Sequence, residues 1–334
     1  MDASVLVLLI IGVALLFDFL NGMNDAANSV ATVVATRVLS PRLAVCWAAF
    51  FNFAAVFLFG TAVARAVGKG IVVPGVVDNA FVLAALLGAI VWVWLCTRYG
   101  IPISVSHSLI GGMVGAAIVK GGLDAVQWWP GVGKIVLFIF LAPIIGLVLG
   151  AVLMIGMLLL ARRSAPQRVD RVFRVLQLAS AAFYSLGHGS NDAQKVAGLI
   201  TALLIANGHL DPKADVPYPI LFLCYAVIGL GTLVGGWRVI RTLGIRVTKL
   251  QPIGGFSAET AGGLTLVLTA VSGIPVSTTH TITGAIMGVG SIRRLSAVRW
   301  GVARNIVIAW ITTIPACGLM AALAWWLLHW AGWF

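Results

Sequence analysis

The sequence predicts an all-α protein that crosses a membrane many times and is built from two related halves. Apolar runs of about 18 residues or more, the length needed to cross roughly 30 Å of hydrocarbon, recur along the whole chain. Motifs of the first half return in the second half in the same order. Basic residues gather in a few loops between the apolar runs, as in membrane proteins of fixed orientation.

The composition excludes a soluble globular protein. Of the 334 residues 60% are hydrophobic and only 10% are charged, and the mean hydropathy is +1.05. A soluble domain of this length needs far more charge to cover its surface. The first apolar run, beginning near Ala3, has no basic residues before it and no small-residue cleavage pattern after it. We therefore expect a retained membrane segment there, not a signal peptide.

Hydropathy divides the chain into about ten apolar segments, consistent with 10–12 membrane segments in all. The first segment is too long for one straight crossing, and polar residues interrupt it at 21–25. The sixth is interrupted in the same way at 188–192. Both are predicted to be broken helices. The segments are 3–36, 42–66, 80–98, 103–119, 133–161, 173–206, 217–238, 255–272, 276–290 and 301–331.

The two halves share three features in the same order. The pattern Gly-x-Asn-Asp-Ala occupies residues 22–26 and returns at 189–193, an offset of 167. The pattern Gly-Ile-Pro-x-Ser-x-x-His occupies 100–107 and returns at 273–280, an offset of 173. A proline then recurs inside a later apolar run of each half. This order predicts an internal duplication, with one repeat over 1–161, a basic cytoplasmic linker over 162–172 and a second repeat over 173–334.

The basic residues predict the orientation of the two repeats. Of the 22 Lys and Arg, 15 lie in four loops, which are expected to be cytoplasmic. The loop 207–216 is acidic and lacks Arg, so it should lie outside, whereas its counterpart after the first segment carries Arg37 and Arg42. The repeats are then inverted, provided that segments 3–4 and 8–9 form re-entrant hairpins tipped by Gly-Ile-Pro. Both termini would lie outside the cell (inner) membrane.

This placement explains the net charge of +12 without a nucleic-acid partner. Inverted repeats with broken helices near the midplane are typical of secondary transporters, in which the substrate site lies between the repeats.

Four acids lie inside apolar segments, where polar groups are costly and mark a pathway. Asp25 and Asp192 lie at the repeated interruptions. Carboxylate and amide oxygens beside unwound backbone carbonyls are suitable ligands for Na⁺ or another hard cation. Alternatively, the Asn and Asp residues at the interruptions only cap helices. The four acids are Asp18, Asp25, Asp192 and Glu259, and the neighbouring amides are Asn21, Asn24, Asn28 and Asn191.

Hydroxyl side chains follow each Gly-Ile-Pro. Proline belongs in the first turn of a helix, so segments 4 and 9 should begin there. Free N–H groups, the positive end of the helix dipole and hydroxyl donors together suit an oxyanion. Alternatively, such hydroxyls bond only to their own helix backbone. The residues are Ser104, Ser106 and Ser108 in one half and Ser277, Thr278, Thr279 and Thr281 in the other.

Several further residues have more than one interpretation. His107 and His280 occupy equivalent positions and either bind substrate or take a proton, but a packed core role is favoured. His188 and Asp18 are left without an assigned role. Lys195 occupies the position of Asn28 and could replace a cation, pair with an anion or neutralise Asp192. Glu259, the only glutamate, is interpreted as a third cation or proton site.

At these residues the sequence resembles the PiT family of inorganic phosphate transporters, in particular its bacterial members. The resemblance implies an inverted-repeat fold, a homodimer and phosphate symport with Na⁺ or H⁺, with no organic cofactor. It implies that Asn24, Ser104, Ser106, Asn191, Ser277, Thr278 and Thr279 surround phosphate, while Asp25 and Asp192 hold cations. The motifs are Gly22-Met23-Asn24-Asp25-Ala26-Ala27-Asn28, the eight residues His188 to Lys195, the two Gly-Ile-Pro stretches and the six residues Gly255 to Thr260.

Two departures from the family pattern bear on the mechanism. Lys195 stands where members with a second Asn-Asp-x-x-Asn carry asparagine, which changes the expected number of Na⁺ sites. The central loop is short, as in bacterial members, which are often paired with a PhoU-like cytoplasmic regulator.

Charge also favours coupling, because the three carboxylates at 25, 192 and 259 and a divalent phosphate would place five negative charges near the midplane. These charges require bound cations or protons. The sequence contains no Walker motif, so ATP is not expected to be the energy source.

Two rival functions remain open from the sequence. A sulfate permease of the same fold would use similar hydroxyls. An intramembrane hydrolase would need one Ser–His–Asp set, whereas here hydroxyls and histidines are duplicated, which suits binding better than nucleophilic attack. No enzyme activity is therefore expected.

Overall fold

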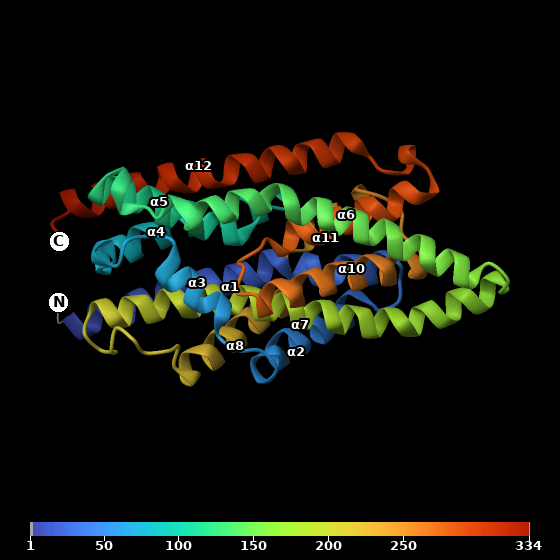
Figure 1. Ribbon diagram of the computed structural model, residues 1–334, viewed down its shortest axis with the longest axis horizontal. Coiled ribbons are helices and arrows are strands. Elements are labelled where there is room, and N and C mark those ends of the chain that lie inside the picture. Colours follow the sequence, from blue (N-terminus) through green and yellow to red (C-terminus); the bar gives the residue numbers. More distant parts are fainter. Residues whose placement is uncertain (1–2, 334) are drawn as a thin grey trace.

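The computed structural model describes residues 3–333, apart from the side chains of Ala3 and Arg293. It is an elongated bundle of helices, many of which run along its long axis (Figure 1). The described residues form no β-strand. The helices in chain order are α1 (Ala3–Ala35), α2 (Pro41–Ala54), α3 (Ala62–Gly70), α4 (Asn79–Tyr99), α5 (Val105–Gly121), α6 (Gly133–Ala161), α7 (Pro166–Ala206), α8 (Tyr218–Val234), α9 (Trp237–Arg241), α10 (Pro252–Val271), α11 (Thr278–Arg293) and α12 (Trp300–Trp330).

Several helices are suited to a bilayer by length and apolarity. In the described part of the chain, α1, α4, α6 with the turn before it, and α12 could each cross a membrane alone. The number rises to six if each of two bent helix pairs counts as one span. The outer helices α6 and α12 leave most of their apolar side chains unburied, as expected for helices that face lipid. The all-helical, multi-pass character predicted from hydropathy is confirmed.

Helices α1 and α7 are continuous, so the prediction of breaks at 21–25 and 188–192 was wrong. The glycines there serve close packing. A Cβ on Gly22 would lie 2.2 Å from the backbone oxygen of Ile228, and one on Gly189 would lie 2.3 Å from that of Asn52. The polar side chains need no unwound backbone, because they bond to one another across the helices.

The bends occur instead in the second membrane segment of each half. The chain turns by 82° between Pro41–Phe57 and α3, and by 65° between α8 and Trp237–Arg246. Gly68 of α3 contacts the backbone of α7 at Gly198, and Gly244 contacts the backbone of α1 at Ala31. Each bent segment therefore lies tightly against one of the two continuous helices.

The two hairpins predicted around Gly-Ile-Pro are present as α4–α5 and α10–α11. Gly100 and Gly273 have φ values of 71° and 65°, a left-handed conformation that favours glycine and reverses the chain. The prediction that proline occupies the first helical turn was wrong. Ser104 and Ser277 cap α5 and α11, so each proline lies two residues before a cap. A serine cap satisfies a first-turn N–H, which proline cannot do.

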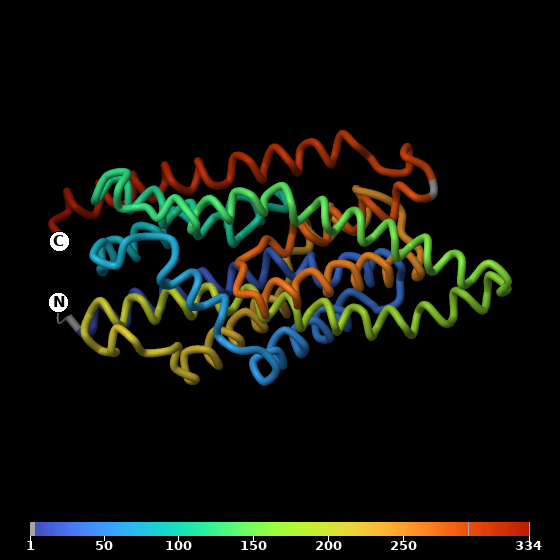
Figure 2. The backbone as a smooth tube through the Cα atoms, in the orientation of Figure 1, coloured from blue at the N-terminus to red at the C-terminus, as the bar shows by residue number. Residues whose placement is uncertain are grey.

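Each hairpin is enclosed by the last long helix of the other half. Helix α12 packs on α4 and α5, and α6 packs on α10 and α11. Glycine again permits close approach, for example Gly115 against Gly318 and Gly146 against the carbonyl of Thr281. The hairpins enter from opposite ends of the bundle and their tips lie near its middle (Figure 2).

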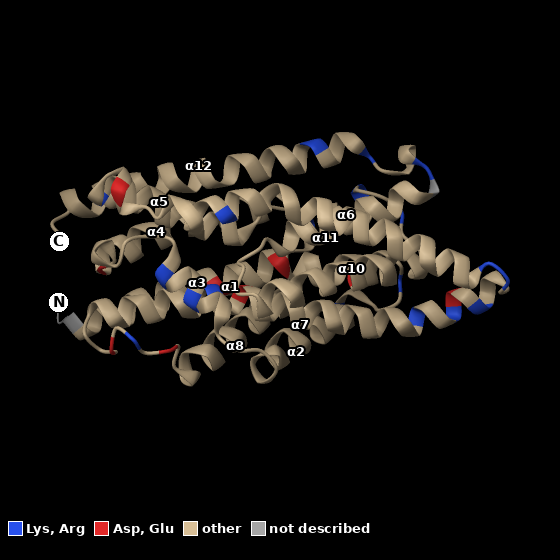
Figure 3. Ribbon diagram, viewed as in Figure 1, with Lys and Arg blue, Asp and Glu red and all other residues tan. Residues whose placement is uncertain are grey.

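Helix α7 begins at Pro166, so most of the predicted linker 162–172 is helical. Its polar sequence forms an extra-long helix that projects with α6 beyond the rest of the bundle (Figure 1), and Arg174 pairs with Asp170 one turn earlier at 2.8 Å. Lys and Arg gather at this projecting end (Figure 3). The start of α1 and the end of α12 both lie at the opposite end (Figure 1).

Candidate functional site

The candidate site lies in the middle of the bundle, where α1 and α7 meet the tips of the two hairpins. Helix α1 contributes Asp25 and Asn28, spaced to share one helical face. Helix α7 contributes His188, Asp192 and Lys195, which share a face in the same way. All five residues are at most 2% exposed. Charged groups at this depth require partners, and the structure shows them.

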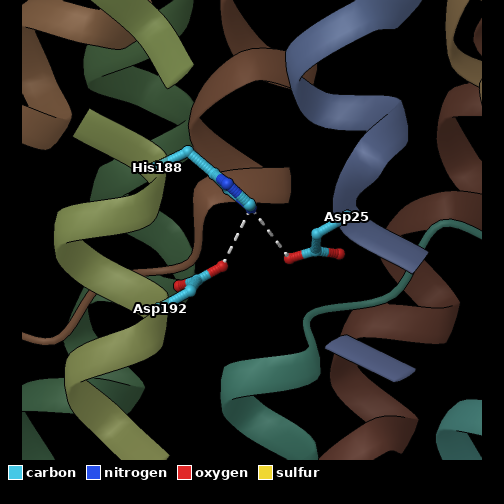
Figure 4. Close-up of side chains that lie close together, drawn as sticks. All are labelled: Asp25, His188 and Asp192. Atoms are coloured by element: carbon cyan, nitrogen blue, oxygen red, sulfur yellow. Dashed lines mark ion pairs between the residues drawn. The ribbon is translucent and has the colours of Figure 1, made fainter. Parts of the chain in front are cut away.

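His188 lies between the two aspartates (Figure 4). Its Nε2 is 3.1 Å from Asp192 Oδ2 and 3.9 Å from Asp25 Oδ2. Its Nδ1 is 3.1 Å from Asn52 Oδ1, and Asn52 uses its amide nitrogen to donate to Thr232 at 3.0 Å. Nδ1 therefore carries a proton, and Nε2 is the nitrogen directed at the carboxylates. These three side chains are also the only group of three His, Cys, Asp or Glu in the described residues close enough to share one metal ion.

Lys195 connects the second hairpin, the first hairpin and Asp192. Its Nζ donates to Asp192 Oδ1 at 2.7 Å, to Ser106 Oγ at 2.5 Å and to the carbonyl of Val276 at 2.9 Å. All three hydrogens of the ammonium are used. The sequence left three roles open for this lysine, and in this conformation it neutralises Asp192.

Threonine hydroxyls from the second hairpin bridge the two aspartates. Thr278 Oγ1 is 3.2 Å from both Asp25 Oδ2 and Asp192 Oδ2, and Thr279 Oγ1 is 3.4 Å from Asp25 Oδ1. Asn28 donates to Thr279 at 2.9 Å. The contacts repeat across the halves, because Asn28 bonds to Thr279 while its counterpart Lys195 bonds to Ser106, the counterpart of Thr279.

Asn24 and Asn191 present oxygens, not amide hydrogens, to their surroundings. Asn191 donates to the carbonyls of Gly187 and Leu266 at 3.1 and 2.9 Å, which fixes the orientation of its amide. Asn24 donates at 2.6 Å to Thr97, whose own hydroxyl is committed to a backbone carbonyl. Both Oδ1 atoms are buried and have no partner in the described part of the chain. Free amide oxygens are ligands for cations, because an oxyanion needs donors.

Glu259 forms a separate buried site on the side of the basic end. Its carboxylate accepts from Thr32 at 2.5 Å, Gln177 at 2.9 Å and Ser180 at 2.5 Å. No ion pair among the described residues includes Glu259. Three neutral donors hold this acid without a positive partner, so it can accept a small cation or a proton.

The arrangement combines an oxyanion site with cation ligands. Donors come from the lysine ammonium, three hydroxyls and the first turns of α5 and α11. Acceptor-only carboxylates and free amide oxygens lie beside them. An anion placed among these donors is repelled by Asp25 and Asp192 unless cations bind with it.

Comparison with known proteins agrees with this geometry. The sequence profile of the Phosphate transporter family matches residues 21–166 and 157–321. The chain belongs to this family. A probable low-affinity inorganic phosphate transporter of Rhizobium meliloti (strain 1021) is 53% identical over 326 residues, covering 97% of each chain. One from Bacillus subtilis (strain 168) is 41% identical over 328 residues, covering 97% of this chain and 98% of its own.

A solved structure extends the similarity to three dimensions. The structure described as "The sodium-dependent phosphate transporter" superposes with a TM-score of 0.89 at 27% identity, covering 97% of this chain and 99% of that chain. It confirms the fold class. Since the family consists of transporters, the expectation that the chain is not an enzyme is confirmed and the hydrolase alternative is dropped.

In this member of the Phosphate transporter family, several residues predicted to bind substrate make helix-capping or packing contacts in the structure. Ser104 and Ser277 accept from the backbone N–H of His107 and His280, each at 3.2 Å, as helix caps. The two imidazoles pack against each other at 4.8 Å between centroids, and His280 stacks on Trp310 at 3.8 Å. This geometry agrees with the packed core role favoured from the sequence.

Sequence reasoning missed the partners that come from distant segments. Asn52, Thr97 and Gln177 each bond to a site residue, yet none lies in a repeated motif. The sequence analysis named His188 without a role, although it lies four residues before Asp192 and therefore on the same helical face.

Proposed function

We propose that this chain is a secondary active symporter that carries inorganic phosphate across the cell membrane together with Na⁺. The observation that carries the proposal is the juxtaposition of Lys195 and three hydroxyl donors with two buried carboxylates. Such a site favours an anion and its cations together over either alone. The similarity to probable inorganic phosphate transporters supports phosphate as the anion, and the similarity to a sodium-dependent phosphate transporter supports Na⁺ as the cation.

Phosphate binds to the donors in this proposal. Thr278 and Thr279 release the aspartates and donate to phosphate oxygens, and Ser106 does the same from the other hairpin. Lys195 supplies a positive charge to the anion from the protein itself, so no cation from solution is needed for that charge. Ser104 and Ser277 contribute by holding the first turns of α5 and α11, whose N–H groups face the anion.

Na⁺ binds to the acceptors. Asp25 and Asp192 provide carboxylate oxygens, and Asn24, Asn28 and Asn191 provide amide oxygens within the same cluster. We assign Asn24 and Asn191 to the cations, because their amide nitrogens already donate hydrogen bonds while their buried amide oxygens have no partner in the described residues. Lys195 reduces the number of Na⁺ ions needed at Asp192, and Glu259 forms a third cation site on the side of the basic end.

The same proposal includes the arrangement in the membrane. The two halves are inverted repeats, the basic end with the α6–α7 projection is cytoplasmic, and both termini are outside. The exposed apolar faces of α6 and α12 suit lipid and a homodimer contact, and the projection offers a surface to a PhoU-like regulator.

Uptake of labelled phosphate into proteoliposomes tests the function, with the Na⁺ and pH gradients varied separately. We expect uptake to follow the Na⁺ gradient and arsenate to compete strongly, with sulfate much weaker. Inhibition by sulfate equal to that by arsenate would favour the sulfate permease. Uptake that ignores Na⁺ would overturn the choice of coupling ion.

A further inference from the structure

One membrane acid has no role in the proposed site. Asp18 lies on α1 and is 0% exposed, and neither of its carboxylate oxygens has a hydrogen-bond partner within 3.5 Å in the described part of the chain, where the neutral amide of Asn21 is the side-chain donor that faces it. No ion pair among the described residues includes it. The other three membrane acids, Asp25, Asp192 and Glu259, all accept hydrogen bonds. A carboxylate without a positive partner is strongly disfavoured at this depth, so it requires a bound proton or cation.

The surroundings of Asp18 suit a proton better than a metal cation. Helix α1 is continuous, so the backbone carbonyls around Asp18 remain in helical hydrogen bonds. The side-chain oxygens that the structure places near Asp18 are the amide oxygen of Asn21 and the hydroxyl of Tyr225, which also faces Gln194. Na⁺ needs more oxygen ligands than this, whereas a proton needs only the carboxylate itself.

The charged and titratable groups that face Asp18 come from α7 and α8. Helix α7 presents Asp192 and His188, and α8 presents Cys224 and Tyr225. Helix α4 also packs on α1 but presents no titratable group to Asp18 in the described residues. Asp192 opposes a second negative charge here and His188 favours one, but neither forms an ion pair with Asp18, and Asp192 is already paired with Lys195.

Asp18 also stands at one end of a continuous polar face of α1. Positions 18, 21, 25, 28 and 32 are spaced by three or four residues, so their polar side chains form one line along the helix. The line passes through the central site at Asp25 and reaches Thr32, which bonds to Glu259. Asp18 therefore lies on the same helical face as the proposed site for phosphate and Na⁺.

We propose that Asp18 binds one proton that is carried with each phosphate, in addition to the cations at the central site. This inference rests on the proposed function. In the present conformation Asp18 is fully buried, and α1 and α8 touch beside it, where a Cβ on Gly231 would lie 2.1 Å from the Phe19 carbonyl. Protonation on one side of the membrane and release on the other therefore requires these helices to separate during transport.

Proton uptake per phosphate tests the assignment. Proteoliposomes would contain a pH-reporting dye and receive labelled phosphate at fixed pH and Na⁺ gradient. Wild type would be compared with Asp18→Asn, with Asp18→Glu, which keeps the acid, and with Asp124→Asn, which removes an exposed acid. Phosphate brings its own protons equally in every variant. We expect Asp18→Asn to move one proton fewer per phosphate than wild type. Asp18→Glu and Asp124→Asn should keep the wild-type number of protons per phosphate.

The outcomes separate this inference from the proposed function. Absence of phosphate uptake by wild type would sink the function, whereas an unchanged proton ratio in Asp18→Asn would overturn only the proton site. Asparagine mimics the protonated acid, so failure of Asp18→Asn to fold would also count against the proposal. If that variant folds but does not transport, infrared spectra decide. The carbonyl band of a protonated carboxylic acid should be present in wild type and lost in Asp18→Asn, and its persistence would refute the assignment.

Discussion

The replacement Lys195→Asn would give the second half the Asn-Asp-x-x-Asn motif of the first, in which Asn28 holds the equivalent position. The ammonium now makes three hydrogen bonds, to Asp192, Ser106 and the carbonyl of Val276. Removing one partner of a buried ion pair costs about 3–5 kcal/mol, because the other charge remains buried. His188 still lies 3.1 Å from Asp192, so we expect a loss near the lower value.

Sodium should recover much of this loss in the Lys195→Asn variant. An asparagine oxygen beside a free carboxylate forms a cation site, and Na⁺ at 100 times its dissociation constant would add about 2.7 kcal/mol. Equilibrium unfolding of the purified protein in detergent, in choline and then in Na⁺, measures both effects. Lys195→Met is the matched control, because it loses the charge but offers no oxygen ligand.

Two results would refute this reasoning. One is a Lys195→Asn variant as stable as wild type in choline, which would mean that the lysine does not neutralise Asp192. The other is equal stabilisation by Na⁺ in the asparagine and methionine variants, which would mean that position 195 does not border a cation site.

Three further predictions concern packing, the buried glutamate and orientation. Gly22→Ala places a Cβ 2.2 Å from a backbone oxygen of α8, so unfolding free energy should fall by about 1–3 kcal/mol, whereas Gly12→Ala, with nothing within 4 Å, should stay within about 0.5 kcal/mol. Ser180→Ala removes a 2.5 Å hydrogen bond to Glu259, the only glutamate, and should lower the unfolding free energy by about 1.5 kcal/mol or more in the same assay, as expected for a bond to a charged group. An unchanged unfolding free energy would contradict an ionised Glu259. Cysteines placed in loop 207–216 should react with an impermeant thiol reagent from outside and those in loop 238–249 only from inside, and labelling from one side would contradict the inverted arrangement.

Much of the fold could be predicted from the sequence, because lipid imposes a simple rule on long helices. The predicted segment 133–161 coincides with α6, and the segment 3–36 differs from α1 by one residue. The hairpins followed from the repeated Gly-Ile-Pro, since glycine with positive φ can reverse a chain between two apolar runs.

The positions of the bends could not be predicted from polarity alone. Polar residues at 21–25 and 188–192 were interpreted as helix breaks, but in a helix surrounded by protein they find partners on neighbouring helices. The bends occur at 58–61 and 235–236, where the sequence is apolar and glycine-containing. A glycine that permits close packing and a glycine that permits a bend look the same in one sequence.

The candidate site was predicted in part. The repeated motifs pointed to Asp25, Asp192 and the hydroxyls after each Gly-Ile-Pro, which do meet in the structure. The orientation of the amide groups of Asn24 and Asn191 could not be predicted, because it depends on partners such as Thr97 and the Leu266 carbonyl, which come from distant segments.

The most direct test of the account is the binding of labelled phosphate to the purified chain as Na⁺ is varied. If cations bind at the carboxylates beside the anion, Na⁺ should raise phosphate affinity, and phosphate should raise Na⁺ affinity by the same factor. Couplings between sites are typically about 5- to 150-fold, and Asp25→Asn should reduce this one. Phosphate affinity that is independent of Na⁺ in wild type, or coupling that survives Asp25→Asn unchanged, would contradict the account.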